Sequence, residues 1–588
     1  MTTDIQFFRF EFNLLIKLVF INYFLYKMRN TATFQKKACP IAVRCLTSIL
    51  YFFLFSLSSL AACVDKEPVD EEDADPAINP YSSYLEEEES GGNTSSGPAF
   101  PVLANYAPAF PGAVGYGRNA DGARGSNNRE IYVVTNLNNS GAGSLRDAVS
   151  QANRIIVFNV SGVIDLNKEV LVFKDNQTVL FQTAPGDGIE LYNGRTSSTN
   201  ANNLIVRYMR MRTGRQVSGS DNIDAGGAAY GHDQIYDHCS FTWGTDECFS
   251  LNNDKQPKGL YNITLQNSIL GQGCQNHSCG GLVQTSDEEG VTVFRNLFID
   301  NKTRNFKVKG LNQFVNNVIY NWGNGAAYNM GGESSGHSNT VIENNYFIKG
   351  PAYTWVNTSY PIETTDKSMF DDETKYHYNG ISSDNKNYLV DTYQQVNPTK
   401  PFIGGNGDGD FDTYCVGNYY DNDKDGTLNG FEITQGNWQT YCSATPVFLS
   451  KPDSQHSEIS IKTSATEAYH WIVKNVGPVL PNRDLVDKFM IDELTSLGTK
   501  GTIFRNQNIE TQYPLAKTWQ NINVGTARKD TDGDGIPDDF EDKWGLNKNN
   551  AGDAVRIAEN GYTMIENYAL SLEFPDEYEK AWNEAYGE

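Results

Sequence analysis

Short β-rich runs recur through the middle of the chain, and each is closed by Asn, Gly or Ser. Matching positions in five of them, Cys239, Asn267, Asn296, Asn317 and Asn345, are 28, 29, 21 and 28 residues apart. Repeats of about 20–30 residues with a strand and a polar turn predict a solenoid, whose coils bury their inner faces by stacking. The six runs are NNLIVRYMRMR from Asn202, DQIYDHCSFTW from Asp233, YNITLQNSIL from Tyr261, GVTVFRNLFI from Gly290, NQFVNNVIYNW from Asn312 and NTVIENNYFI from Asn339.

These repeats favour an all-β fold, a right-handed parallel β-helix. Leucine-rich repeats need leucines at fixed offsets and helical repeats need a period of 3.6 residues, and the runs have neither. A β-propeller is the alternative, but its blades of about 40 residues do not match the spacing. We expect the Asn column to form a ladder of side-chain hydrogen bonds between coils. Stacked coils also leave a long groove along one flank, a shape that suits a polymer.

The remaining sequence divides into segments around a β-helix predicted for residues 109–350. We expect an export segment at 1–62, an acidic flexible tether at 63–108 and a long insertion with a calcium loop at 351–460. A partly helical C-terminal segment at 461–588 is expected to pack on the β-helix, because residues 463–497 have a helical hydrophobic pattern. The tether carries eleven acids and one lysine between Asp65 and Glu89, as a solvated spacer would.

The N-terminal segment has the features of an export signal. Leu46–Leu60 is an apolar run of 15 residues, short for a membrane span and typical of a signal peptide. It ends in Leu60-Ala61-Ala62-Cys63, which resembles a bacterial lipobox, so we predict lipidation at Cys63. The sequence thus predicts an exported outer-membrane lipoprotein, at the cell surface or facing the periplasm, that meets the membrane only through this anchor.

Beyond the three cysteines of the export signal, six remain, an even number that allows up to three disulfides. The pair Cys274 and Cys279 brackets a short loop and is one candidate bridge. None of the six has the CxxC spacing of a zinc site. They are Cys239, Cys248, Cys274, Cys279, Cys415 and Cys442.

A formal net charge of −25 argues against nucleic acid as a partner, because the chain has no basic stripe to contact phosphates. An acidic polymer could still bind through a local cluster of cations or a bound metal. The segment IDNKTRNFKVKG provides such a cluster with Arg304, Lys307 and Lys309. We expect a monomer.

Two twelve-residue stretches have the spacing of calcium loops, with oxygen ligands at alternating positions and a Gly at position 6. We predict that both bind Ca²⁺ as structural sites. The first has Asp421, Asp423, Asp425, Asn429 and Glu432, and the second has Asp530, Asp532, Asp534, Asp538 and Glu541.

Several long passages resemble the pectate lyase family, the calcium-dependent β-helix lyases of plant cell-wall pectin. They are AFPGAVGYGRNADGARG (109–125), YVVTNLNNSGAGSLRDAVSQANRIIVFNVSGVI (132–164), DHCSFTWGTDECFSL (237–251), FVNNVIYNWG (314–323) and GYTMIENYALSL (561–572). The resemblance covers roughly residues 109–350, with a second patch near the C-terminus. It implies Ca²⁺ as cofactor and acidic plant polysaccharide (pectate) as partner.

The resemblance also implies a set of site residues. The family's calcium-binding aspartates correspond to Asp224 and Asp246, and its next acid falls at Ser250, so Glu247 is the expected substitute. Many members read Arg-x-Pro-Arg where this chain reads Arg304-Asn305-Phe306-Lys307. Arg304 corresponds to the catalytic base, with Lys307 as the second basic position and alternative base. His277 and Lys309 are the expected substrate-binding residues.

The chemistry explains why such residues belong together. Removing the proton next to a carboxylate builds a second negative charge, which a divalent cation offsets. Adjacent coils would place the acids side by side as calcium ligands. We therefore predict a calcium-dependent lyase that acts endo on pectate. The alternatives are a non-catalytic glycan-binding β-helix, a β-helix pectin hydrolase that uses paired carboxylates and a surface adhesin.

Overall fold

The computed structural model describes residues 97–587 except for 105–106, 215–222, 254–258, 275–277, 324–326, 332–336, 352–359, 363–375, 382–387, 393–399, 405–410 and 502–520. All of them belong to one compact unit that spans residues 79–588. The predicted export segment, Cys63 and most of the predicted tether lie outside the described residues. No helix in the described ranges combines the length and apolar character needed to cross a membrane.

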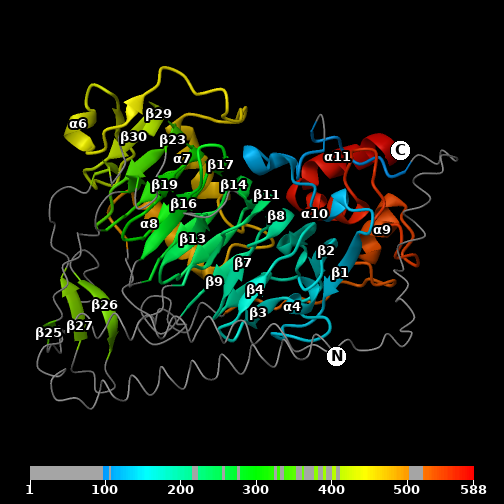
Figure 1. The fold of residues 1–588 in the computed structure, drawn as a ribbon. Helices are drawn as coiled ribbons and strands as arrows, with labels where there is room; N and C mark the ends of the chain where they lie inside the picture. The colour runs from blue at the N-terminus through cyan, green and yellow to red at the C-terminus, as the bar shows by residue number, and fades with distance from the viewer. Residues whose placement is uncertain are drawn as a thin grey trace, which may run out of the picture. The chain divides into compact units, whose positions relative to one another are not determined.

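Three long sheets form the body of this unit, and the chain passes from one to the next in turn (Figure 1). For example, β8 of the first sheet is followed by β9 of the second and β10 of the third, and β11 then pairs with β8 in parallel. One circuit of three strands is therefore one coil, and the predicted parallel β-helix is confirmed.

The first sheet has 11 strands: β1 (Glu130–Val134), β2 (Arg154–Phe158), β5 (Gln177–Leu180), β8 (Ala201–Arg207), β11 (Gly231–Asp237), β14 (Leu260–Gln266), β17 (Val291–Phe294), β20 (Leu311–Val315), β23 (Ser338–Glu343), β29 (Phe411–Val416) and β32 (Val447–Phe448). The second has 10: β3 (Gly162–Asp165), β6 (Ile189–Tyr192), β9 (Arg210–Arg212), β12 (Ser240–Thr242), β15 (Ile269–Gly271), β18 (Leu297–Ile299), β21 (Val318–Tyr320), β24 (Tyr346–Ile348), β30 (Asn418–Asp421) and β31 (Phe431–Ile433). The third has six: β10 (Gly226–Ala228), β13 (Glu247–Asn252), β16 (Cys279–Gln284), β19 (Lys307–Lys309), β22 (Tyr328–Met330) and β28 (Phe402–Gly404).

Smaller elements surround these sheets. The strands β4 (Val170–Val172) and β7 (Arg195–Ser197) form a parallel pair, and β25 (Tyr360–Ile362), β26 (Tyr376–Ile381) and β27 (Tyr388–Thr392) form an antiparallel sheet. The α-helices are α4 (Leu145–Ala148), α6 (Trp438–Tyr441), α7 (Ala465–Asn475), α8 (Leu485–Thr495), α9 (Asp538–Trp544), α10 (Met564–Glu573) and α11 (Pro575–Tyr586). Short 3₁₀ turns are η1 (Tyr116–Asn119), η2 (Gly122–Gly125) and η3 (Phe181–Thr183).

Aromatic side chains fill the space inside the coils. Phe298 contacts Phe306 edge-on at 5.2 Å between ring centroids and Phe314 at 5.6 Å, and all three are buried. Burial of each such ring contributes about 1.5–3 kcal/mol relative to an exposed position. Phe306 fits because Gly281 lies on the next coil: a Cβ there would come within 2.6 Å of the Phe306 ring.

A ladder of buried polar side chains joins successive coils at the turn between the first and second sheets. Asn317 Oδ1 accepts from Asn296 N at 2.9 Å, and Asn345 Oδ1 accepts from Asn317 N at 2.8 Å. At the next coil toward the N-terminus the member is Ser268, whose Oγ accepts from Cys239 N at 3.0 Å. The prediction that Asn267 belongs to this column was wrong by one residue, because a Ser hydroxyl replaces the amide.

The β-helix also continues beyond residue 350, where the sequence predicted its end. β28, β29 and β30 pair in parallel with β22, β23 and β24, so residues 402–421 build a further coil. The ladder continues into this coil, since Asn418 Oδ1 accepts from Asn345 N at 3.1 Å. The predicted insertion therefore interrupts the solenoid instead of following it.

Helices cover the outer faces of two sheets, as the helical pattern of residues 463–497 predicted for α7 and α8. Ile472 and Met490 share a buried cluster with Ile299 of the second sheet. Ion pairs add to this contact, because Arg212 Nη2 lies 2.7 Å from Asp484 and 2.9 Å from Asp487. In the same way, α9 and α10 bury their apolar residues against the first sheet. Figure 1 shows both helix groups lying against the coils.

The six cysteines from Cys239 to Cys442 are all free thiols, which corrects the expected disulfides, the Cys274–Cys279 bridge included. Five of them are buried, and Cys239 and Cys248 are part of the apolar core inside the coils. They act as small buried side chains.

We expect Asn317→Ala to lower the unfolding free energy by about 1–3 kcal/mol, because it leaves the buried Asn296 N–H without its acceptor. Chemical unfolding followed by circular dichroism measures the change. Asn138→Ala, at an exposed loop position, is the matched control and should leave the midpoint unchanged. Equal midpoints for the two variants would contradict a stabilising ladder.

Candidate active site

The predicted acidic residues lie side by side on neighbouring coils of the third sheet. β10 pairs with β13 so that Gly226 is opposite Phe249, and Asp224 and Glu247 each lie two residues earlier. Ala225 N donates to Glu247 O at 3.1 Å, and Glu247 N donates to Asp224 Oδ1 at 3.1 Å. The parallel register therefore brings two acids that are 23 residues apart into direct contact.

The next two coils extend this row to Arg304. Glu247 pairs with Cys279, and Cys279 forms a β-bridge with Thr303, directly before Arg304. Arg304 has a φ of +53°, a left-handed conformation that costs of the order of 1 kcal/mol or more and is held by its surroundings. Its carbonyl accepts from Gly281 N at 2.6 Å, which anchors this turn to the neighbouring coil.

The Arg304 guanidinium is directed back at the acids. It forms an ion pair with Glu247, and its Nη1 lies 4.0 Å from Asp246 Oδ1. Carboxylate oxygens of Asp246 and Glu247 also lie within 4.8 Å of each other and of the Cys279 sulfur. The structure thus gathers Asp224, Asp246, Glu247 and Arg304 into one site.

The negative charge of the three carboxylates near Arg304 makes this site electrostatically unbalanced. Burial raises the pKa of Glu247 to about 9, with further contributions from Asp246 and Asp224, while Arg304 opposes the shift. Burial also raises the pKa of Asp224, which the hydrogen bonds from Glu247 counteract. A buried carboxylate cluster of this kind has a high affinity for a proton or a cation, because either one reduces the repulsion. These three acids could hold a divalent metal ion.

The other predicted residues of the site have different positions. Lys307 opens β19 and is half-buried, on the coil that carries Arg304. Lys309 is only 2% exposed, with its ammonium 5.1 Å from the centre of the Phe411 ring. This burial argues against the predicted contact between Lys309 and substrate. His277 lies outside the described residues.

The sequence analysis did not identify Lys302, a cation beside the site. Lys302 is half-buried two residues before Arg304, and burial lowers its pKa, with a smaller lowering from the Arg304 charge and an opposing effect of Cys279. Its only signal in the sequence is membership of the same basic segment, which does not tell which of the lysines are buried beside Arg304.

Comparisons with known proteins show which family this chain belongs to. The probable pectate lyase C of Aspergillus fumigatus is 42% identical over 474 residues, which is 81% of this chain and 96% of that protein. The probable pectate lyase C of Aspergillus flavus is 42% identical over 79% of this chain and 94% of its own length. The chain belongs to the pectate lyase family.

The family assignment rests on these relatives and not on the comparisons with family models and solved structures. No family model matches the chain. A pectate lyase from Bacillus sp. N165, solved with trigalacturonate, has 14% sequence identity and a TM-score of 0.35, and the alignment covers 62% of this chain and 98% of that one.

This member of the pectate lyase family has a second acidic cluster, in the predicted C-terminal calcium loop. Carboxylates of Asp530, Asp532 and Asp534 lie within 4.8 Å of one another, and so do those of Asp534, Glu541 and Asp553. Burial raises the pKa of Asp534 to about 9 and that of Glu541 to about 8. Both oxygens of Asp532 and of Glu541 are buried without a hydrogen-bond partner. This donor set fits a calcium ion.

The acidic cluster at this loop differs from the predicted ligand set at a single position. Asp538 Oδ2 pairs with Lys529 Nζ at 2.6 Å and accepts from Thr531 Oγ1 at 2.8 Å, so it is directed away from the cluster. Asp553, which comes from the turn after α9, lies in the cluster where Asp538 was predicted. No loop spacing predicts Asp553, because it lies twelve residues beyond the last loop position.

The other predicted calcium loop is not assembled. Among the described residues, no three carboxylates that include Asp421, Asp423, Asp425 or Glu432 lie within 4.8 Å of one another. Glu432 is held on β31, opposite Tyr419 of β30, and accepts from Gly417 N at 3.3 Å. Asn429 Nδ2 donates to Asp425 Oδ2 at 3.1 Å.

Three of the free thiols, Cys248, Cys274 and Cys279, lie near the site and are buried. We expect a reducing agent to leave the thermal unfolding midpoint unchanged, because the fold contains no bridge among the described cysteines. Alkylation after denaturation without reductant, read by peptide mass spectrometry, should label each of the six residues from Cys239 to Cys442. A pair that is labelled only after reduction would contradict the structure.

Proposed function

We propose that this chain is a calcium-dependent pectate lyase that cleaves polygalacturonate by β-elimination. The observation that carries the proposal is the convergence of Asp224, Asp246 and Glu247 with Arg304 across adjacent coils. The 42% identity with probable pectate lyases over most of the chain supports the same reaction class.

The reaction needs a base, a way to offset charge and no added water. The proton on the carbon next to the uronate carboxylate is removed, a double bond forms to the neighbouring carbon, and that carbon's bond to the glycosidic oxygen breaks. The leaving oxygen takes up a proton. A bound Ca²⁺ ion would offset the charge that develops on the carboxylate.

The proposed calcium ligands are Asp224, Asp246 and Glu247. The fit rests on three oxygen-bearing side chains gathered in a partly buried row, where the raised pKa values of Asp224 and Glu247 show the cost of leaving them unneutralised. Oxygen ligands of this type suit Ca²⁺.

Arg304 is the proposed base. In the structure its guanidinium pairs with Glu247. Burial lowers the pKa of Arg304, but the neighbouring Cys279 and Glu247 side chains reverse this, so the pKa lies above its usual value. Arg304 can accept a proton from substrate only after its guanidinium has lost its own proton. The raised pKa opposes that loss, so the effect of the neighbouring groups must first be removed. Engagement of Glu247 and Asp246 as ligands would remove it and leave Arg304 beside the Lys302 charge. Lys307, on the same coil, is the alternative base.

A second, structural calcium ion is proposed for the C-terminal loop, bound by Asp530, Asp532, Asp534, Glu541 and Asp553. The loop packs on the N-terminal end of the β-helix, where a Cβ at Gly535 would lie 2.5 Å from Val157. Calcium there would hold the C-terminal segment against the first coils.

The proposed location is outside the cell, on the evidence of the apolar run Leu46–Leu60. The similar curated proteins come from Aspergillus and related fungi, so the comparisons do not support a bacterial outer-membrane lipoprotein. Lipidation at Cys63 stays a prediction from the sequence, as does the monomeric state.

Arg304→Ala should reduce the rate of lyase turnover by about 10²–10⁴-fold, the usual contribution of a positioned base. The measurement is the rise in ultraviolet absorbance of unsaturated uronate ends, with purified protein, polygalacturonate and Ca²⁺. Lys488→Ala, an exposed cation on α8, is the control and should retain full activity.

Chelation with EDTA should abolish the same signal in the wild-type protein, and excess Ca²⁺ should restore it. Full activity of Arg304→Ala would exclude Arg304 as the base. Saturated reducing ends that form equally well in EDTA would instead indicate a hydrolase, and binding without any turnover would indicate a glycan-binding protein.

Calcium should stabilise the fold through the C-terminal loop, by about 2.7 kcal/mol at a concentration 100 times the dissociation constant. Asp553→Ala should lose most of the calcium-dependent rise in the thermal unfolding midpoint, because it removes a ligand. Asp538→Ala should keep that rise, since Asp538 is directed toward Lys529. If the two variants respond to calcium alike, the assignment of Asp553 as a ligand is wrong.

A further inference from the structure

A cavity of about 390 Å³ opens on a different edge of the coils from the candidate active site. Its lining includes His238, Asn267 and Arg295, which follow β11, β14 and β17 of the first sheet, at the turns toward the second sheet. Asp246 and Arg304 instead lie at the turns that lead into the third sheet. α7 contributes Trp471 to the cavity wall and α10 contributes Glu573.

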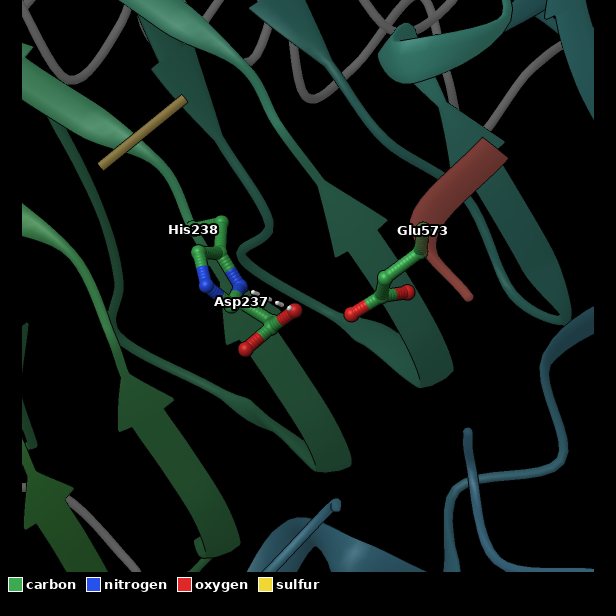
Figure 2. Close-up of side chains that lie close together, drawn as sticks. All are labelled: Asp237, His238 and Glu573. Carbon is green, nitrogen blue, oxygen red and sulfur yellow. Dashed lines mark hydrogen bonds and ion pairs between the residues drawn. The ribbon is translucent and has the colours of Figure 1, made fainter. Parts of the chain in front are cut away.

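Three acids line this cavity, Asp237, Glu573 and Glu577, and the first two share the Arg207 guanidinium as counter-ion. Figure 2 shows Asp237, His238 and Glu573 close together, with the His238 ring bonded to the Asp237 carboxylate. Arg207 Nη2 donates to Asp237 Oδ2 at 2.7 Å and to Glu573 Oε1 at 2.9 Å. Because one guanidinium bonds both carboxylates, Asp237 and Glu573 are held in place as a wall of the cavity.

The same network fixes His238. Its Nδ1 lies 2.9 Å from Asp237 Oδ2, and its ring stacks on Tyr208 at 4.9 Å between centroids. Asp237 Oδ1 in turn accepts from Asn267 Nδ2 at 2.8 Å. His238 and Asn267 are therefore held in single orientations before any ligand arrives, which reduces the entropy cost of binding.

Arg295 is the cation of this cavity that forms no ion pair with a described acid. It is 9% exposed, lies between the rings of Phe294 and Trp471, and donates from Nη2 to the Ile461 carbonyl at 2.5 Å. Burial alone lowers its pKa, with no contribution from an acidic neighbour, and its Nε is buried without a hydrogen-bond partner. Nearby, Asn267 Oδ1 is also buried without a partner. A buried cation without a counter-ion is costly unless an anion from outside provides one.

The remaining lining identifies the class of anion. The cavity volume lies in the range of small-molecule sites, about 300–1,000 Å³. Trp471, Phe574 and His238 offer flat faces for a sugar ring, and Asn267 and Glu573 offer polar atoms for its hydroxyl groups. A pyranose ring that carries a carboxylate could stack on these aromatic side chains and form an ion pair with Arg295.

We propose that this cavity is a second saccharide-binding site that takes a uronate unit, with Arg295 as its carboxylate partner. The choice of uronate among ring-bearing carboxylates rests on the proposed function. The site would hold one part of an acidic polysaccharide on the flank of the β-helix while another part occupies the row of Asp246 and Arg304.

Titration of the full-length protein with digalacturonate in EDTA tests this site, with isothermal calorimetry as the readout. EDTA removes the calcium on which the active-site row depends. It also removes the structural calcium proposed for the C-terminal loop, so circular dichroism at the titration temperature first establishes that the protein is folded in EDTA. We expect one binding site per chain, and at least about tenfold weaker binding of the uncharged disaccharide galactobiose, because it lacks the group that pairs with Arg295. Equal affinity for the two disaccharides, or no binding of digalacturonate at millimolar concentration, would overturn the proposal.

Variants of Arg295 test whether digalacturonate binds in this cavity. Arg295→Met keeps the apolar stem between Phe294 and Trp471 and should weaken digalacturonate binding by at least about tenfold, whereas Arg295→Lys should retain most of it. Arg483→Met is the matched control, since Arg483 also donates to a backbone carbonyl, Val476 O at 2.8 Å, but does not line the cavity. Unchanged binding in Arg295→Met would overturn the assignment, and the wild-type comparison of the two disaccharides stands if this variant does not fold.

The same proteins separate this proposal from the proposed function. Arg304→Ala should bind digalacturonate in EDTA as the wild type does, and Arg295→Met should keep its turnover of trigalacturonate with Ca²⁺. Binding in a wild-type protein that shows no lyase turnover would refute the function alone. Turnover without binding in EDTA would refute the second site alone.

Discussion

The parallel register between coils is the constraint on which the rest of this structure depends. Each strand of the third sheet pairs with the strand one coil away, so residues at the same position in successive coils become neighbours. Asp224, Glu247, Cys279 and Thr303 are brought into one row by this pairing, with Arg304 at its end. A slip of one residue would turn each of these side chains to the other face of the sheet.

Register is in turn secured by contacts that tolerate no slip. The ladder from Cys239 through Ser268 to Asn345 bonds each side chain to the backbone of the coil before it. Inside the coils, the Phe306 ring fits only against a glycine at 281. With the backbone fixed in this way, three carboxylates can be held close together although they repel one another. The raised pKa of Glu247 reflects its burial and this repulsion. A site assembled from mobile loops would relieve that repulsion by moving the acids apart.

The sequence predicted those features that repeat or that obey a local spacing rule. The β-helix, the helical segment at 463–497 and the grouping of Asp224, Asp246, Glu247 and Arg304 all follow from coil spacing and from resemblance to the pectate lyase family. The loop Asp530 to Glu541 follows from a twelve-residue pattern. In contrast, the coil at 402–421 was missed because Asn418 comes 73 residues after Asn345, so its place in the repeat is hidden by the insertion.

Other errors arose where a distant segment decides the surroundings of a side chain. Lys309 and Lys307 are two residues apart on β19 and are expected on the same face, but Phe411, from the coil after the insertion, covers Lys309. Asp553 replaces Asp538 in the acidic cluster because Lys529 and Thr531 draw Asp538 away.

The decisive measurement is a crystal structure of Arg304→Ala with Ca²⁺ and an oligogalacturonate. The account predicts calcium ligated by Asp224, Asp246 and Glu247, with a uronate carboxylate bound to it. Calcium found at the C-terminal loop alone, with the acids of the third sheet unligated and the oligosaccharide elsewhere, would contradict it.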